Sequence, residues 1–410
     1  MAAIQAGREA RRLGVPLAIV ALDGASRLGA KILVAGGGRC NVTHDTVDER
    51  SFAGSTPAAI RNLLRRFDVP ATVRFFEDLG VPLKREETGK LFPVDDRSRS
   101  VLDALLTACR DAGVTLLHPW RIVELAREGD RFTIAGPQGS IAARRVVLTT
   151  GGLALPKSGS DGHGMTVARR LGHTTTPVFP ALVPLVLEES AFVRRLPGIA
   201  VPARLTLRTG SGKTLTTVEG PVLCTHFGLS GPAVLDMSRH WNAARRDDGS
   251  VSLSLDWLPR VDPSDLTERG ETASTFLRAR LPERLADALC REAGIAPSAP
   301  LARLSRVERR ALVETIGAWR IPVTGDRGFT HAEVTAGGIP LAEARLETLE
   351  SRVCPGLHLA GEILDVDGRI GGYNFQWAWA TGTIAGRAAA AALIQDAPSR
   401  SGGSTPAASR

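Results

Sequence analysis

One stretch near the C-terminal end, residues 360–386, constrains the fold of this chain more than any other part. It opens where the apolar segment 357–360, which has the pattern of a short buried strand, reaches an acidic residue, Glu362. Two adjacent glycines follow, which allow a close backbone approach because they lack a Cβ. Residues 376–394 are then apolar, Ala-rich and free of proline, which predicts a helix.

A glycine turn that leads into a helix is typical of an anion-binding site, because unpaired N–H groups and the helix dipole point at one place. The order of strand, acid, glycines and helix therefore predicts a nucleotide cofactor whose sugar hydroxyl is held by a carboxylate. For Glu362 the alternative is simple solvation of a helix end. The residues expected to contact the cofactor from this block are Gly361, Glu362, Gly371, Gly372, Asn374 and Phe375.

A second glycine block, residues 28–43, follows an apolar segment at 16–23 that reads as a buried parallel strand ending in Asp23. In a dinucleotide-binding fold, the acid that ends the second strand holds a ribose hydroxyl and the next loop covers the cofactor. The alternative for Asp23 is a surface turn. The contacts expected from this part are Asp23, Lys31, Gly36, Gly37, Gly38, Arg39 and Asn41. Cys40 is interpreted as a small residue that fills a tight loop, since no second cysteine is near it in sequence.

A third strand-to-glycine transition lies at 149–152, before a helical pattern at 162–171. It adds Thr150 and Gly151 to the expected cofactor contacts. The other predicted helices span 1–13, 57–67, 71–79 and 98–113, and a strand is predicted at 114–118. Segments 121–127, 131–136 and 144–149 are predicted to form a short antiparallel set that returns to the main sheet.

The pattern of apolar residues changes near residue 184. Apolar and polar residues alternate as in strands from 203 to 256, and apolar residues recur with helical spacing over 263–319. A β part and a helical part are therefore expected as insertions in an α/β domain. The expected division is 1–187 and 341–395 for the two parts of the cofactor domain, 188–260 for the β subdomain, 261–325 for the helical subdomain and 326–340 for the return strand. Residues 396–410 read as a disordered tail.

Composition sets the class of protein. The chain has 410 residues, 43% hydrophobic and 23% charged, as is ordinary for a soluble enzyme, and no apolar run reaches the ~18 residues that span a bilayer. Five scattered cysteines form no C-x-x-C pair, and the histidines have no metal-ligand spacing. These features predict a cytoplasmic protein with reduced thiols, without a membrane segment or a metal site.

The formal net charge of +8 leaves a nucleic-acid partner open. Only five of the 51 basic residues are lysine, which is also what G+C-rich coding produces, and the arginines are spread along the chain. Charge alone therefore favours no partner.

The blocks named so far, together with 225–232 and 334–338, occur in an order that resembles the bacterial FAD/NAD(P)-dependent oxidoreductases that include aminoacetone oxidase-like and dehydro-bile-acid reductase-like proteins. The resemblance covers residues 1 to about 394. It implies an α/β fold: a Rossmann-type FAD-binding domain interrupted by the β and helical subdomains, with the flavin near their interface.

One departure concerns the opening strand and its G-x-G-x-x-G turn, which such folds need at the pyrophosphate and which this sequence does not contain. Two interpretations follow: a wrongly assigned start codon, or a protein that has lost its cofactor. We expect the first, because Asp23 and the two glycine blocks persist. The expectation is that in-frame DNA upstream of Met1 encodes the missing strand.

The resemblance implies that FAD relays hydride between NAD(P)H and an unsaturated small molecule or a nucleobase of ribosomal RNA. No second G-x-G-x-x-G marks a separate NAD(P)H domain, so that cofactor would dock at the flavin face. The alternatives are amine oxidation with O2, or a cofactor-free binding protein if Met1 is the true start. His226 is a candidate general acid or a turn brace, and Tyr373 a candidate proton donor or a packed aromatic ring.

Overall fold

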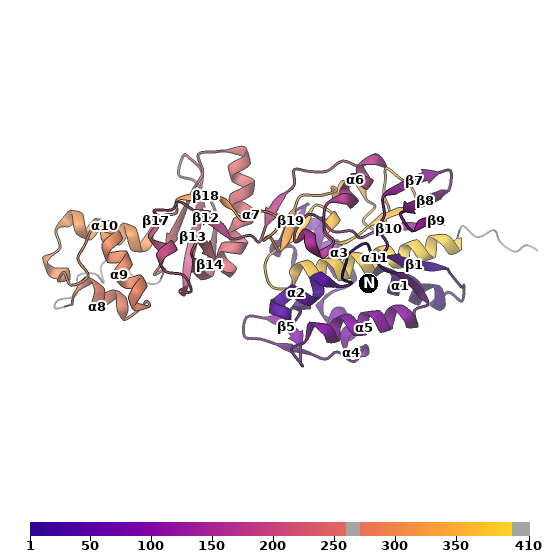
Figure 1. The fold of residues 1–410 in the computed structure, drawn as a ribbon, viewed down its shortest axis with the longest axis horizontal. Helices are drawn as coiled ribbons and strands as arrows, with labels where there is room; N and C mark the ends of the chain where they lie inside the picture. The colour runs from indigo at the N-terminus through magenta and orange to yellow at the C-terminus, as the bar shows by residue number, and fades with distance from the viewer. Residues whose placement is uncertain (260–270, 396–410) are drawn as a thin grey trace, which may run out of the picture.

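Two lobes make up the computed structural model, which describes residues 1–259 and 271–395 (Figure 1). The larger lobe contains both chain ends of the described part, and the smaller lobe is formed by the middle of the chain. The expected tail at 396–410 and the start of the expected helical subdomain lie outside the described residues.

Parallel strand pairs form the centre of the larger lobe. β1 (Ile19–Leu22) pairs with β6 (Val114–Leu117), and β10 (Val146–Leu148) pairs with β20 (Leu357–Leu359). The helices of this lobe are α1 (Ala2–Arg12), α2 (Ala30–Gly38), α3 (Pro57–Arg66), α4 (Val69–Asp78), α5 (Ser98–Asp111), α6 (His163–Arg170) and α11 (Tyr373–Gln395).

Smaller antiparallel units surround these pairs. They are β2 (Thr43–His44), β5 (Lys90–Pro93) and β4 (Leu83–Arg85); β3 (Phe52–Gly54) with β21 (Val366–Gly368); β7 (Glu124–Glu128), β8 (Arg131–Gly136) and β9 (Gly139–Ala143); and β11 (Phe179–Ala181) with β19 (Val334–Ala336). The predicted antiparallel set was wrong at its third strand. The meander closes with β9, and the segment assigned to that strand instead forms β10 and pairs in parallel with β20.

Small residues allow α1 to lie closely against α11 and against the end of α5. A Cβ on Gly386 would stand 2.1 Å from the carbonyl oxygen of Ala2, and one on Gly7 would stand 2.2 Å from that of Ala112. These contacts place the first turn of α1 beside the carboxyl ends of the parallel strands.

β1 and β10 are not paired with each other within the described chain. An apolar cavity of about 560 Å³ is lined by both strands and by α1, α11 and the meander. Its presence leaves Val20 of β1 42% exposed, which is unusual for a parallel strand between helices.

A seven-stranded sheet forms the smaller lobe, in the order β17-β16-β13-β14-β15-β12-β18. Its strands are β12 (Leu185–Leu187), β13 (Ala200–Arg208), β14 (Thr214–Thr225), β15 (Gly228–Ser230), β16 (Ser252–Asp256), β17 (Trp319–Arg320) and β18 (Val323–Asp326). Its helices are α7 (Pro232–Asp247), α8 (Ala273–Arg278), α9 (Glu283–Glu292) and α10 (Arg306–Gly317). The sheet and these helices share one hydrophobic core, which includes Trp257, Phe276 and Leu285.

Short 3-10 turns connect the elements of both lobes: η1 (Glu49–Ser51), η2 (Pro156–Ser158), η3 (Phe192–Arg195), η5 (Leu301–Arg303), η6 (Leu341–Glu343) and η7 (Gly361–Ile363). None of the helices over residues 1–259 and 271–395 is long and apolar enough to cross a membrane.

Candidate cofactor groove

A groove of about 510 Å³ runs along the carboxyl ends of β1, β10 and β20 in the larger lobe. Open α/β sheets bind ligands at this edge, because the loops that leave the strands surround a crevice there. The groove brings together six of the residues predicted from the sequence: Asp23, Lys31, Thr150, Gly151, Gly361 and Glu362.

Asp23 follows β1, and its backbone continues the pairing with β6 through its N–H to Leu117 (3.1 Å) and its carbonyl to the Trp120 N–H (2.7 Å). Its Oδ1 accepts a hydrogen bond from the Ala25 N–H at 2.8 Å. The turn therefore has a fixed orientation. Its other oxygen, Oδ2, has no hydrogen-bond partner in the described part of the chain and can accept from a ligand hydroxyl.

Glu362 lies in η7 and is held from two sides. Its Oε2 is 2.6 Å from the Lys31 Nζ, and its Oε1 accepts from the Thr335 N–H at 3.0 Å. Both side chains of the ion pair are partly exposed, 29% for Lys31 and 17% for Glu362. The pair thus presents a positioned acceptor and a cation with unused N–H donors in the same groove.

Two of the predicted glycines face open space. Gly37 (φ +69°) and Gly361 (φ +79°) are left-handed, and a Cβ added to either would meet nothing within 4 Å. Gly36 differs, since its Cβ would stand 2.8 Å from the Phe92 ring. The run Gly36–Gly38 breaks α2, in which Ala35, Gly36 and Gly37 have non-helical dihedral angles.

The remaining predicted contacts do not line the groove: Gly36, Gly37, Gly38, Arg39, Asn41, Gly371, Gly372, Asn374 and Phe375. Arg39 pairs with Glu86 at 2.6 Å, and the Asn374 side chain bonds the N–H and the carbonyl of Gly368. The polar groups of Arg39 and Asn374 are therefore used within the chain, whereas the buried Asn41 Oδ1 has no hydrogen-bond partner among the described residues.

Gly372 makes the close backbone approach that its sequence context predicts, but to the chain itself. Its Cβ would stand 2.6 Å from the carbonyl carbon of Thr43. Phe375 stacks on Trp379 with ring centroids 5.5 Å apart. This glycine turn therefore allows the start of α11 to pack closely against β2.

The two candidate proton donors lie in different lobes. Tyr373 is the first residue of α11 rather than a loop residue, and its ring is buried and stacked on His44 at 4.9 Å. Burial raises the pKa of its hydroxyl. His226 is exposed in the turn between β14 and β15, where its carbonyl accepts from the Arg194 Nε at 2.9 Å.

Cys40 is fully buried, and burial raises the pKa of its thiol to about 12. A thiol that stays protonated at neutral pH is a poor nucleophile. Its place against Val42, Phe76 and other apolar residues agrees with a packing role. The residues that the structure describes contain no cluster of histidine, cysteine and acidic side chains able to hold a metal ion.

Sequence reasoning missed several groove residues, chiefly Trp120, Arg121, Asp161 and His163. Arg121 and Asp161 form an ion pair of 2.6 Å. Two buried polar atoms in the groove wall, the Thr150 Oγ1 and the His163 Nε2, have no hydrogen-bond partner among the described residues. Unsatisfied atoms of this kind, beside aromatic walls and two carboxylates, fit a large polar and aromatic ligand such as FAD.

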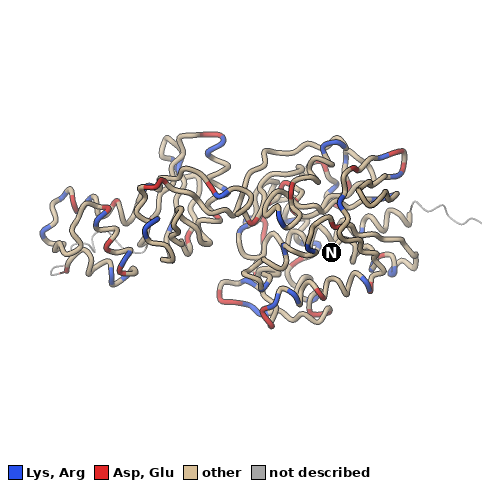
Figure 2. The backbone as a smooth tube through the Cα atoms, viewed as in Figure 1, with Lys and Arg blue, Asp and Glu red and all other residues tan. Residues whose placement is uncertain are grey.

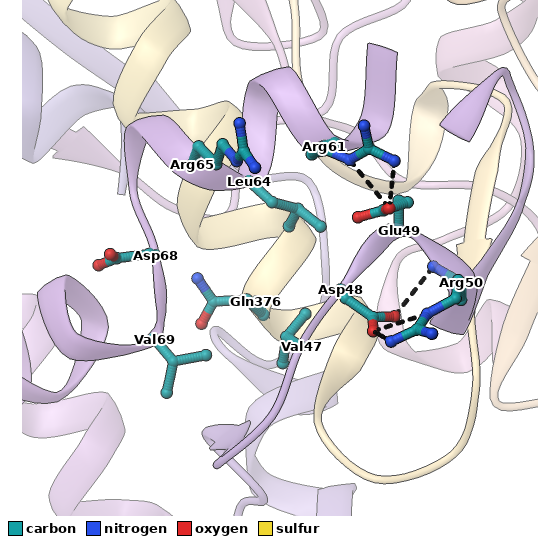
Figure 3. A pocket seen from close by; sticks show the side chains of 10 residues that line it. All are labelled: Val47, Asp48, Glu49, Arg50, Arg61, Leu64, Arg65, Asp68, Val69 and Gln376. Atoms are coloured by element: carbon teal, nitrogen blue, oxygen red, sulfur yellow. Dashed lines mark hydrogen bonds and ion pairs between the residues drawn. The ribbon is translucent and has the colours of Figure 1, made fainter. Parts of the chain in front are cut away.

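A second cavity, of about 340 Å³, lies between η1 and α3 (Figure 3). The acidic side chains Asp48 and Glu49 neutralise Arg50 and Arg61 at 2.6 and 2.5 Å. The Gln376 amide bonds Thr43, Thr72 and Phe67. Most polar groups of this cavity are therefore engaged within the chain, unlike those of the groove.

Basic and acidic residues alternate along the backbone of both lobes (Figure 2). Many arginines are paired, as Arg278 is with Asp287 at 2.8 Å. The basic residues are therefore distributed over both lobes rather than confined to one segment of the chain.

The groove at the carboxyl ends of parallel strands is the binding place of a dinucleotide fold, and comparison with known proteins agrees. Residues 1–388 match the family model described as the HI0933-like protein Rossmann domain. The chain belongs to this family. The α/β class and the sequence resemblance are thereby confirmed, and the HI0933-like family places the chain among FAD-binding oxidoreductases.

Two characterised relatives match nearly the whole chain. The 3-dehydro-bile acid Δ(4,6)-reductase of Clostridium scindens is 34% identical over 378 residues, which cover 90% of this chain and 92% of the relative. The ribosomal RNA dihydrouridine synthase of Escherichia coli is 32% identical over 384 residues, which cover 92% and 91%. The relatives therefore share a fold while their names give very different substrates.

Proposed function

We propose that this chain is an FAD-dependent reductase that passes hydride from NAD(P)H to a carbon–carbon double bond conjugated to a carbonyl, in a small molecule or a nucleobase. The observation that carries the proposal is the convergence of Asp23, the Lys31–Glu362 pair and Thr150 on one groove at the carboxyl ends of the parallel strands. The substrate class is supported by the two relatives. A Δ(4,6)-reductase and a dihydrouridine synthase both saturate such a double bond, one in a steroid and one in a pyrimidine.

The groove residues have distinct tasks in this proposal. The Asp23 carboxylate accepts from a ribose hydroxyl, as the acid at the end of a second Rossmann strand does. Glu362 is held in place by Thr335 and Lys31, so it accepts from a hydroxyl of the ribityl side with little reorganisation. The Lys31 ammonium, which lies 2.6 Å from the Glu362 carboxylate, would add positive charge to the same part of the groove and so favour an electron-rich cofactor there.

When bound, FAD supplies the hydride chemistry. Saturation of a conjugated double bond also requires one proton on the substrate. The Tyr373 hydroxyl, with its raised pKa, stays protonated at neutral pH and is one candidate. His226, which is exposed in the turn between β14 and β15 of the smaller lobe, is the other candidate.

Anaerobic half-reactions of the FAD-loaded protein test the proposal. NADH or NADPH should reduce the flavin and so remove its visible absorption. In the absence of O2, a conjugated enone steroid or a uridine-containing RNA should then restore this absorption, and should do so faster than air restores it in a parallel sample. Reduction by an amine followed by reoxidation only with O2 would support the amine-oxidase alternative and contradict the reductase. Flavin that none of these donors reduces would contradict both.

A further inference from the structure

His163 is the first residue of α6, and its side chain lies in the wall of the groove. Its Nε2 is buried and has no hydrogen-bond partner within the described residues. Its backbone N–H, by contrast, is bonded to the Asp161 Oδ1 at 3.1 Å. The backbone of this residue is thus fixed while one ring nitrogen remains unsatisfied.

The same part of the wall holds a second unsatisfied atom. The Thr150 Oγ1 follows the end of β10, is buried and lacks a partner. It packs against the start of α6, since a Cβ on Gly164 would stand only 1.7 Å from it. Buried polar atoms cost free energy unless they are bonded, so two of them at one place in a ligand groove indicate contacts that a ligand supplies.

Neighbouring groups do not use these atoms. The Asp161 carboxylate is engaged by Arg121 at 2.6 Å and by the His163 backbone. The groove wall also carries the hydroxyl groups of Ser158 and Ser160, but neither is bonded to the Thr150 Oγ1 or the His163 Nε2. Both atoms therefore remain available to a ligand in the groove.

We infer that His163, together with Thr150, binds oxygen atoms of the dinucleotide, with the His163 Nε2–H donating to a phosphate or ribose oxygen. The inference rests on the proposed function, because it names residues for the cofactor of that same groove. It assigns to His163 a specific hydrogen bond rather than a packing role.

FAD affinity of the flavin-stripped full chain, measured by titration of flavin fluorescence, tests the inference. His163→Phe keeps a ring of similar shape without the nitrogen and should weaken binding about tenfold, the size expected for one lost hydrogen bond of ~1.4 kcal/mol. His163→Gln places an amide nitrogen near the original Nε2 and should recover most of the affinity. Thr150→Val should weaken binding to a similar extent.

Two matched controls lie outside the groove. The His358 Nε2 and the Thr383 Oγ1 are also buried without a partner, but neither residue lines the groove. His358→Phe and Thr383→Val should therefore leave FAD affinity within twofold of wild type, and thermal unfolding with and without FAD separates any loss of stability from loss of binding.

Equal affinity of His163→Phe and wild type would overturn the inference while leaving the proposed function intact. Equal weakening by His163→Phe and His358→Phe would overturn it too, because the effect would then be structural. A wild-type chain that binds no FAD at all would instead contradict the proposed function.

Discussion

Three side chains, Glu343, His173 and Ser351, are connected in the order of an acid–base–nucleophile triad. The His173 Nδ1 is 2.6 Å from the Glu343 Oε2, and its Nε2 is 2.9 Å from the Ser351 Oγ. The serine hydroxyl, however, also accepts the N–H groups of Val353 and Cys354, and Ser351 and His173 are 1% and 3% exposed. The network is therefore a structural tie between the end of α6 and residues 343–354.

The Glu343–His173–Ser351 network predicts that the free energy of unfolding depends on pH. Burial by itself would raise the pKa of Glu343, but hydrogen bonds from Thr174 and His173 outweigh it and hold the pKa below its usual value. The carboxylate thus stabilises the fold above the unfolded pKa of about 4.3, and this stabilisation is lost as the pH falls through the folded pKa. Glu343→Gln should lower the free energy of unfolding by ~1–3 kcal/mol at pH 7.

Urea unfolding of both proteins at a series of pH values measures this. The gap between wild type and Glu343→Gln should be largest at neutral pH and shrink in acid below pH ~4. A gap that stays constant from neutral pH to pH ~3 would show that the carboxylate charge contributes nothing.

A second test at the scale of single residues asks whether Tyr373 or His226 donates the proton to the substrate. Tyr373→Phe and His226→Gln should both leave flavin reduction by NAD(P)H almost unchanged. The substitution that removes the true proton donor should slow the reaction of reduced flavin with substrate by a factor of ~10²–10⁴. Stopped-flow measurement of the two half-reactions decides between them, and equal slowing of both halves would assign a structural role to the residue concerned.

At the scale of elements, glycine has opposite roles at two positions. One is Gly372, in the turn before α11, and the other is Gly361, at the start of η7. Gly372 has φ +96° and packs on the Thr43 backbone, whereas Gly361 has φ +79° and faces the open groove. Both positions are backbone-strained for other residues, but only the second leaves room for a side chain.

Paired substitutions test this difference. Gly372→Val should lower the melting temperature strongly, because its Cβ must displace the Thr43 carbonyl. Gly361→Ala should cost only the ~1–2 kcal/mol of a left-handed alanine while weakening FAD binding, since its methyl group enters the groove. Thermal unfolding and FAD titration of both variants suffice. A stable Gly372→Val protein, or unchanged FAD affinity of Gly361→Ala, would contradict the placement.

In the whole molecule, α7 of the smaller lobe is bonded to β21 of the larger lobe and to the residues that follow this strand. Arg239 forms two hydrogen bonds with Asp367, at 2.7 and 3.0 Å, and the Asp236 Oδ1 accepts from the Ile370 N–H at 2.8 Å. The Asp367 side chain is 2% exposed. These contacts connect the two lobes directly.

Removing one charge from this buried pair should be costly. Asp367→Asn leaves Arg239 without its counter-charge and should destabilise the protein by ~3–5 kcal/mol or loosen the smaller lobe. The exposed pair Arg310–Glu314 is the control, because loss of a surface ion pair typically costs less than ~1 kcal/mol. Limited proteolysis and denaturant unfolding measure both effects, and an Asp367→Asn protein as stable and protease-resistant as Glu314→Gln would contradict the tie.

Much of this architecture follows from local sequence pattern. Apolar periodicity and the glycine that follows predict α1, and the apolar segment before Asp23 predicts β1, since both depend on neighbouring residues. The partner of β10 was not predictable in this way, because it is more than 200 residues distant in sequence. Asp23 and Glu362, which both line the groove, were predicted as cofactor contacts because an acid at a strand end is a local signal. His163 was missed because its unsatisfied Nε2 depends on what the fold brings near it.

The visible absorption spectrum of the purified chain, incubated with FAD and freed of unbound flavin, tests the central claim most directly. The account predicts a yellow protein with the bands of oxidised flavin. It also predicts that Glu362→Ala, which removes the acceptor beside Lys31, retains much less flavin at unchanged secondary structure. A folded wild-type chain that stays colourless, or a Glu362→Ala protein as yellow as wild type, would contradict the account.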